Sequence, residues 1–79
     1  MDTRKEVLEI LEELHPDIDF ETEKSLIDDK VLDSFDVVTL VTELGSAFDI
    51  EITAADMVPE NFNSLDAMTE MVENLLAEF

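Results

Sequence analysis

One serine stands between two carboxylates at the point where a loop gives way to a helical pattern. Asp33-Ser34-Phe35-Asp36 precedes apolar residues that recur at steps of three and four positions. A helix beginning there would hold the Ser34 hydroxyl at its amino end, where unpaired backbone N–H groups favour a phosphate. No base lies near Ser34 in the sequence, so we interpret it as a site of attachment. The alternative is a serine that only caps the helix.

Catalysis by the chain itself is not indicated. His15 is the only histidine, and Pro16 follows it at the end of a helical stripe, which favours a capping or surface role over that of a general base. Ser34 lacks the Gly-x-Ser-x-Gly surroundings of a hydrolase nucleophile, and no histidine follows it. We therefore predict no catalytic residues.

A calcium loop is suggested by acidic residues that alternate after Pro16. An EF-hand loop needs glycine at its sixth place, and here that place holds Thr22. A solvated acidic loop is the better interpretation, and we predict no specific metal site. The residues concerned are Asp17, Asp19, Glu21, Glu23 and, at the twelfth place, Asp28.

Two long helices are expected around the serine motif. The first begins at a capping box of Thr3 and Glu6 and ends at His15-Pro16. The second runs from about Phe35 to Phe48, and residues 16–33 form a long ordered loop between them. The expected apolar stripes are Val7, Ile10, Leu11 and Leu14 in the first helix, and Val37, Val41, Leu44 and Phe48 in the second, with Val38 and Leu40 beside them.

The second half of the sequence predicts a short helix and a long one. Residues 49–52 alternate like a strand but read better as a connector, and Thr53 opens a short helix that stops before Pro59. Asn63-Ser64 caps the last helix. Gly45 is expected at a close contact. The expected core residues here are Leu65, Val72, Leu75, Leu76 and the methionines Met57, Met68 and Met71.

Length and composition support one small all-α domain over residues 1–79, with three longer helices, one short helix and a long loop after the first. The chain of 79 residues has no cysteine, so a core built from its 46% hydrophobic residues must stabilise it. No apolar run reaches the ~20 residues that span a bilayer. No signal peptide opens the chain, and we expect a cytoplasmic monomer.

The charge selects the kind of partner. Four Lys and Arg against 22 Asp and Glu leave a formal net charge of −18. This field repels nucleic acid and anionic membranes and attracts basic protein surfaces. The acids are interleaved with regularly spaced apolar residues, which favours a folded domain over a disordered acidic tail.

Several segments together resemble the acyl carrier protein family. They are Leu32-Asp33-Ser34-Phe35-Asp36, the apolar residues Val38, Leu40, Val41 and Leu44, and Phe48-Asp49-Ile50-Glu51-Ile52. The similarity extends to length, acidity, the long first loop and the order of helices. It implies an acyl-carrier-like four-helix bundle in which Ser34 takes 4′-phosphopantetheine from coenzyme A through a Mg²⁺-dependent phosphopantetheinyl transferase. The arm's thiol would hold acyl or aminoacyl groups as thioesters.

The resemblance also implies which residues meet partners. Asp33 matches the aspartate that faces the transferase, and Phe35 and Asp36 match positions that flank the arm. Asp36 and Glu43 keep charge on the outer side of the second helix, where fatty-acid carriers have more glutamates. The acids beside Ser34 oppose a phosphodiester, so we expect them to serve recognition rather than stability.

Two alternatives for function remain. The approach Asp28-Asp29-Lys30-Val31-Leu32 to the serine motif looks closer to stand-alone carriers served by an adenylating ligase, such as D-alanyl carrier proteins, than to fatty-acid carriers. The cargo is therefore an acyl group or an activated amino acid, which ligases and acyltransferases with basic docking surfaces would handle. The rival from another class is an unmodified acidic adaptor that docks basic partners through its second helix.

Overall fold

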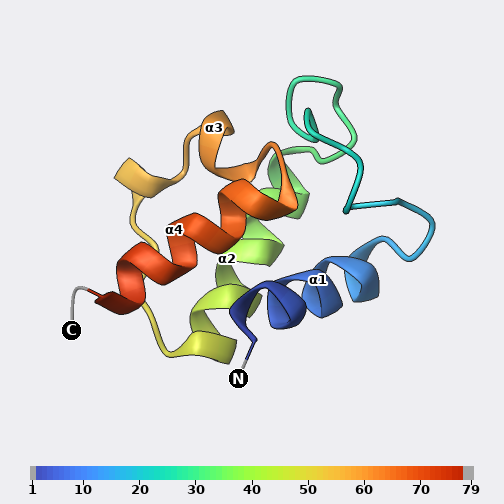
Figure 1. Ribbon diagram of the computed structural model, residues 1–79. Helices are drawn as coiled ribbons and strands as arrows, with labels where there is room; N and C mark the ends of the chain where they lie inside the picture. Colours follow the sequence, from blue (N-terminus) through green and yellow to red (C-terminus); the bar gives the residue numbers. More distant parts are fainter. Residues whose placement is uncertain (1, 78–79) are drawn as a thin grey trace.

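In the part of the chain that the structure describes, three long helices and one short helix pack around a common core (Figure 1). The computed structural model describes residues 2–77. In chain order the elements are α1 (Thr3–Leu14), α2 (Ser34–Phe48), the 3₁₀ turn η1 (Ala54–Asp56), α3 (Pro59–Phe62) and α4 (Leu65–Ala77). No strand occurs within this described range. The prediction of an all-α, acyl-carrier-like bundle is confirmed.

The first helix begins one residue earlier than expected. Asp2 is its N-cap, and its Oδ1 accepts a hydrogen bond from the Lys5 backbone N–H at 3.3 Å. Thr3 is the first helical residue, so the predicted capping box of Thr3 and Glu6 is wrong. Aspartate is a slightly better cap than threonine, which agrees with this outcome. The predicted end is confirmed, because His15 leaves the helical region and its N–H donates to the Leu11 carbonyl.

The loop of residues 16–33 supplies a large part of the core. It arches away from the bundle between α1 and α2 (Figure 1) and contains turns but no helix. Its apolar side chains turn inward to join those of the helices. The buried apolar residues are Val7, Leu11, Phe20, Leu26, Leu32, Leu40, Leu44, Phe48, Ile50, Phe62, Leu65, Met68, Met71 and Val72.

Two of the predicted core stripes need correction. In α2 the buried face turns toward Leu40, while Val37 and Val41 are only partly buried and Val38 is exposed. In α4 the residues from Leu65 to Val72 are placed as expected, but Leu76 lies at the rim and is 37% exposed. Helical spacing gives the side of a helix on which a residue lies, but the depth of its burial depends on the neighbouring segments.

Asn63, which lies between α3 and α4, links the long loop to the helices through hydrogen bonds. Its Oδ1 accepts the backbone N–H groups of Ile27 at 2.9 Å and Asp28 at 3.1 Å, and its own carbonyl accepts the N–H of Leu26. The expected role of Asn63 in capping the last helix is therefore wrong. Ser64 alone caps α4, since its Oγ accepts the Ala67 N–H at 3.0 Å.

The end of α2 is tight, as predicted for Gly45. The Gly45 carbonyl accepts the N–H groups of Asp49 and Ile50, and Asp49 adopts a left-handed conformation with φ 54°. A Cβ at position 45 would lie 3.2 Å from the Ile50 carbonyl oxygen. The following residues 49–52 form a connector, as expected.

The segment before α4 differs from the prediction in one respect. The Thr53 N–H does donate to Asp56 Oδ2 at 3.2 Å, but this pair opens only the 3₁₀ turn η1. The short α-helix follows it and begins at Pro59. Proline suits the first helical position because its missing N–H has no partner there in any case.

Candidate functional site

Ser34 is the first residue of α2, and its side chain is exposed. Asp33 is the N-cap, because its Oδ1 accepts the Asp36 backbone N–H at 2.9 Å. The alternative that Ser34 acts only as the cap is therefore wrong. The serine hydroxyl is left at the amino end of a four-turn helix, which carries partial positive charge.

The carboxylates on either side of Ser34 form a reciprocal capping box. Asp36 Oδ2 accepts the Asp33 backbone N–H at 3.2 Å, which completes the pair of hydrogen bonds. Such caps contribute about 1 kcal/mol to stability, and negative charge is favourable at a helix N-terminus. The sequence predicted that these acids serve recognition and not stability. The second half of that prediction is wrong, because both acids cap α2. Their contact with partners stays a prediction.

His15 reaches the same capping box from the end of α1. Its Nε2 lies 3.1 Å from Asp36 Oδ2, and the two side chains are 31% and 19% exposed. Nε2 is shielded from solvent and has no hydrogen-bond partner among the described residues, and the contact is an ion pair only when the imidazole is protonated. The sequence predicted a capping or surface histidine. It could not show this contact because 20 residues separate the partners.

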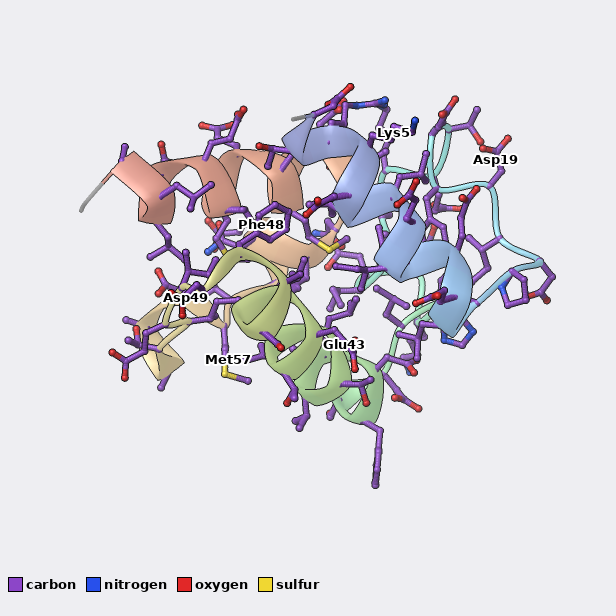
Figure 2. All side chains as sticks on the ribbon, turned by 90° about the horizontal axis from the view of Figure 1, so that it is seen from below. Lys5, Asp19, Glu43, Phe48, Asp49 and Met57 are labelled. Atoms are coloured by element: carbon purple, nitrogen blue, oxygen red, sulfur yellow. The ribbon has the colours of Figure 1, made fainter. Side chains whose placement is uncertain are left out.

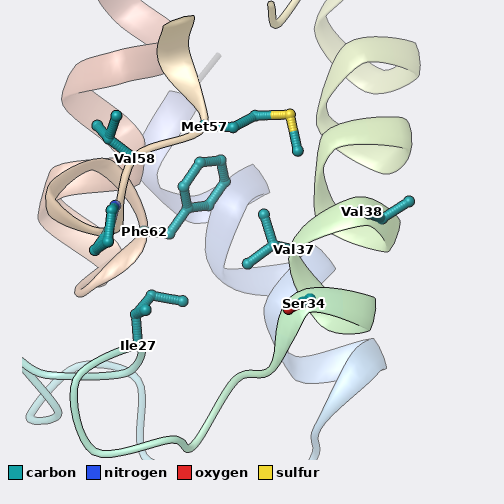
Figure 3. Close-up of a pocket in the computed structure, with 8 residues that line it drawn as sticks. Ile27, Ser34, Val37, Val38, Met57, Val58 and Phe62 are labelled. Atoms are coloured by element: carbon teal, nitrogen blue, oxygen red, sulfur yellow. The ribbon is translucent and has the colours of Figure 1, made fainter. Parts of the chain in front are cut away.

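An apolar cavity of about 260 Å³ opens beside Ser34 (Figure 3). One wall is α2, and the other comes from the segment that leads into α3. Phe62 stands between these walls, and the Met57 thioether extends toward α2. The lining residues are Ile27, Ser34, Val37, Val38, Met57, Val58, Pro59 and Phe62.

The sequence did not identify most of this lining. Met57 was expected in the core, but it is 38% exposed at the cavity. Ile27 comes from the long loop, and Val58 and Phe62 come from the N-cap and the end of α3, so only the fold brings them together. Sequence spacing carries no signal for such a group, since each residue is an ordinary apolar residue within its own segment.

The remaining predicted recognition residues lie on the outer side of α2. Phe35 is 83% exposed and Val38 is 56% exposed, which is unusual for large apolar side chains. Glu43 is exposed as well and borders a shallow groove between α1 and α2. Glu43 and Met57 lie on opposite flanks of α2 (Figure 2). The structure thus places Asp33, Phe35 and Asp36 beside Ser34, and Glu43 about two and a half turns along the helix.

The acidic loop forms no metal cluster. Within residues 2–77, no three His, Asp or Glu side chains converge closely enough to hold a metal ion. Asp19 lies at the outer edge of the loop (Figure 2), and its Oδ1 accepts the Glu21 N–H. No helix in the described part of the chain is long and apolar enough to cross a membrane.

Comparison with known proteins finds relatives along nearly the whole chain. A D-alanyl carrier protein of Streptococcus thermophilus is 36% identical over 76 residues, which cover 95% of this chain and 96% of the relative. A D-alanyl carrier protein of Streptococcus suis is 32% identical over 77 residues, with coverage of 96% and 98%. No protein-family profile matches the chain.

Proposed function

We propose that this chain, which belongs to the D-alanyl carrier protein family, carries D-alanine as a thioester on a 4′-phosphopantetheine arm attached to Ser34. The relatives confirm the resemblance to stand-alone carriers and the prediction of a carrier that is not an enzyme. The observation that supports Ser34 most strongly is its position, exposed at the first residue of α2 and not needed as the cap. A visiting transferase can reach such a hydroxyl.

The residues around Ser34 fit a phosphopantetheine group. The amino end of α2 favours a phosphodiester, because the helix dipole and free N–H groups attract negative charge. The adjacent cavity presents apolar side chains along which an arm can lie. When bound, the group supplies a thiol, which a chain without cysteine lacks. The protein's own part is to present the hydroxyl and to shape its surroundings.

The partners follow from this role. A phosphopantetheinyl transferase attaches the arm, an adenylating ligase loads the amino acid, and an acyltransferase removes it. The net charge of −18 favours basic docking surfaces on all three. We expect the carrier to act as a monomer in the cytoplasm, where coenzyme A is available.

Recognition is assigned to Asp33, Phe35, Asp36 and Glu43. Phe35 offers an apolar surface beside the arm, and exposed aromatic side chains of this kind often carry interface energy. Glu43 adds charge farther along α2. For Asp33 and Asp36, recognition comes in addition to their capping role.

Intact mass spectrometry tests the proposal. The purified chain is incubated with coenzyme A, Mg²⁺ and a phosphopantetheinyl transferase, with Ser34→Ala as control. The wild-type chain should gain the mass of one phosphopantetheine arm and the variant none. A wild-type chain that gains nothing would instead support an acidic adaptor.

A second experiment tests the cargo. The modified carrier is offered D-alanine, other amino acids and fatty acids with candidate ligases. Preferential loading of D-alanine is expected, and preferential loading of a fatty acid would contradict the assigned cargo.

A further inference from the structure

The two ends of the long loop meet at one carboxylate oxygen. His15 follows α1, and its Nε2 lies 3.1 Å from Asp36 Oδ2. The same oxygen accepts the Asp33 backbone N–H at 3.2 Å in the capping box of α2. A side chain at the end of α1 therefore contacts the group that closes the first turn of α2, the turn that contains Ser34.

This contact is more sheltered than an ordinary surface ion pair. The Asp36 side chain is 19% exposed, and the Nε2 atom of His15 has almost no contact with solvent. By comparison, the side chains of the ion pair between Arg4 and Asp66 are 45% and 61% exposed. The imidazole therefore covers one side of the Asp36 carboxylate at close range and limits the orientations open to it.

We propose that His15 is a positioning residue for phosphopantetheine transfer to Ser34, acting through Asp36. The inference rests on the proposed function, in which the Ser34 hydroxyl accepts the arm. Without His15, the Asp36 carboxylate is free to turn toward solvent, and the hydrogen bond from the Asp33 N–H is lost. The first turn of α2 then frays, and the direction of the Ser34 hydroxyl is no longer fixed. Group transfer is sensitive to such orientation.

The test measures steady-state transfer from coenzyme A with the intact chain as the varied substrate. His15→Ala should lower kcat/KM by about tenfold, mainly through kcat, because the hydroxyl is presented in fewer productive orientations. His15→Gln should restore most of the rate, since its side-chain amide nitrogen can lie beside the Asp36 carboxylate in a position similar to that of Nε2. A role in stability alone would not give this rescue at a temperature where all variants are folded.

Arg4→Gln is the matched control. It removes a contact between α1 and α4 and lies about 16 Å from His15 along α1. It should lower stability without changing the rate of transfer. Should His15→Ala fail to fold, His15→Leu fills a similar volume without a polar atom, and it should show the same slow transfer.

Amide hydrogen exchange gives an independent readout. The Asp33 N–H should exchange faster in folded His15→Leu than in the wild-type chain, while the amides of α4 should not change. The positioning role of His15 is overturned if His15→Ala or His15→Leu accepts the arm at the wild-type rate. It is also overturned if Arg4→Gln lowers the transfer rate by an equal factor. Neither result affects the proposed function. A wild-type chain that accepts no arm overturns the proposed function as well, so the two failures are distinguishable.

Discussion

At the residue scale, Asp33 combines two roles that the sequence presents as one motif. It flanks the proposed attachment site, and its carboxylate accepts the Asp36 N–H as the cap of α2. Substitution to alanine removes both the cap and the charge. Substitution to asparagine removes only the charge, because asparagine is an equally good N-cap.

We therefore expect different results from the two substitutions. Asp33→Ala should lower the free energy of unfolding by about 1 kcal/mol, and Asp33→Asn by much less. Both should slow loading by the transferase if the charge serves recognition. Urea unfolding and transfer rates, measured on the same samples, check this. Normal loading of Asp33→Asn would show that Asp33 acts only as a cap.

At Phe35 a single substitution can separate recognition from stability, because Phe35, unlike Asp33, is exposed and caps no helix. Because its side chain is 83% exposed, Phe35→Ala should change the free energy of unfolding by no more than about 0.5 kcal/mol. It should slow arm attachment or ligation, since the exposed ring is assigned to partner contact. Ser46→Ala, an exposed substitution about 16 Å farther along α2, is the control and should change neither. A large fall in melting temperature for Phe35→Ala would contradict the assignment.

At the scale of elements, the predictions succeeded where local chemistry decides the outcome. The end of α1 at His15-Pro16 and the tight packing at Gly45 follow from backbone sterics that a short segment contains. The cap residues were harder to predict, because Asp2 and Asp33 each stand beside another good capping residue. The cavity wall and the contact between His15 and Asp36 could not be predicted, since they depend on how segments distant in the sequence pack together.

Asn63 is the clearest element-scale contact that sequence reasoning missed. Its side chain links the loop to the start of α4 through the N–H groups of Ile27 and Asp28. Asn63→Ala should cost about 1–3 kcal/mol, because two backbone donors lose their partner. Hydrogen exchange should accelerate at Ile27 and Asp28 more than in α1. Uniform acceleration throughout the chain would show that Asn63 supports only global stability.

At the scale of the whole molecule, acidic residues far outnumber basic ones. Asp66 is paired with two of the few basic residues, with Arg4 Nε at 3.0 Å and Lys24 Nζ at 3.6 Å. The hydrogen bond from Arg4 lowers the pKa of the Asp66 carboxyl, and that bond raises the pKa of Arg4. Most other carboxylates must remain without a basic partner, because only four Lys and Arg face 22 acids.

Salt should therefore stabilise the fold. Millimolar Mg²⁺ or added NaCl should raise the melting temperature, because counterions screen repulsion among the carboxylates. Calorimetry over a range of ionic strength checks this. Arg4→Gln should show a larger salt effect than the wild-type chain, since it leaves Asp66 with one basic partner fewer. A melting temperature that does not depend on salt would contradict the importance of repulsion.

The central claim, that Ser34 carries the arm, is tested most directly by peptide mass spectrometry after incubation with coenzyme A and a phosphopantetheinyl transferase. The chain offers other serines for comparison at Ser25, Ser46 and Ser64. We predict one phosphopantetheine group, found on the peptide containing Ser34 and localised to that residue by fragmentation. An arm on another serine, or an unmodified Ser34 peptide after complete reaction of a known carrier in parallel, would contradict the account.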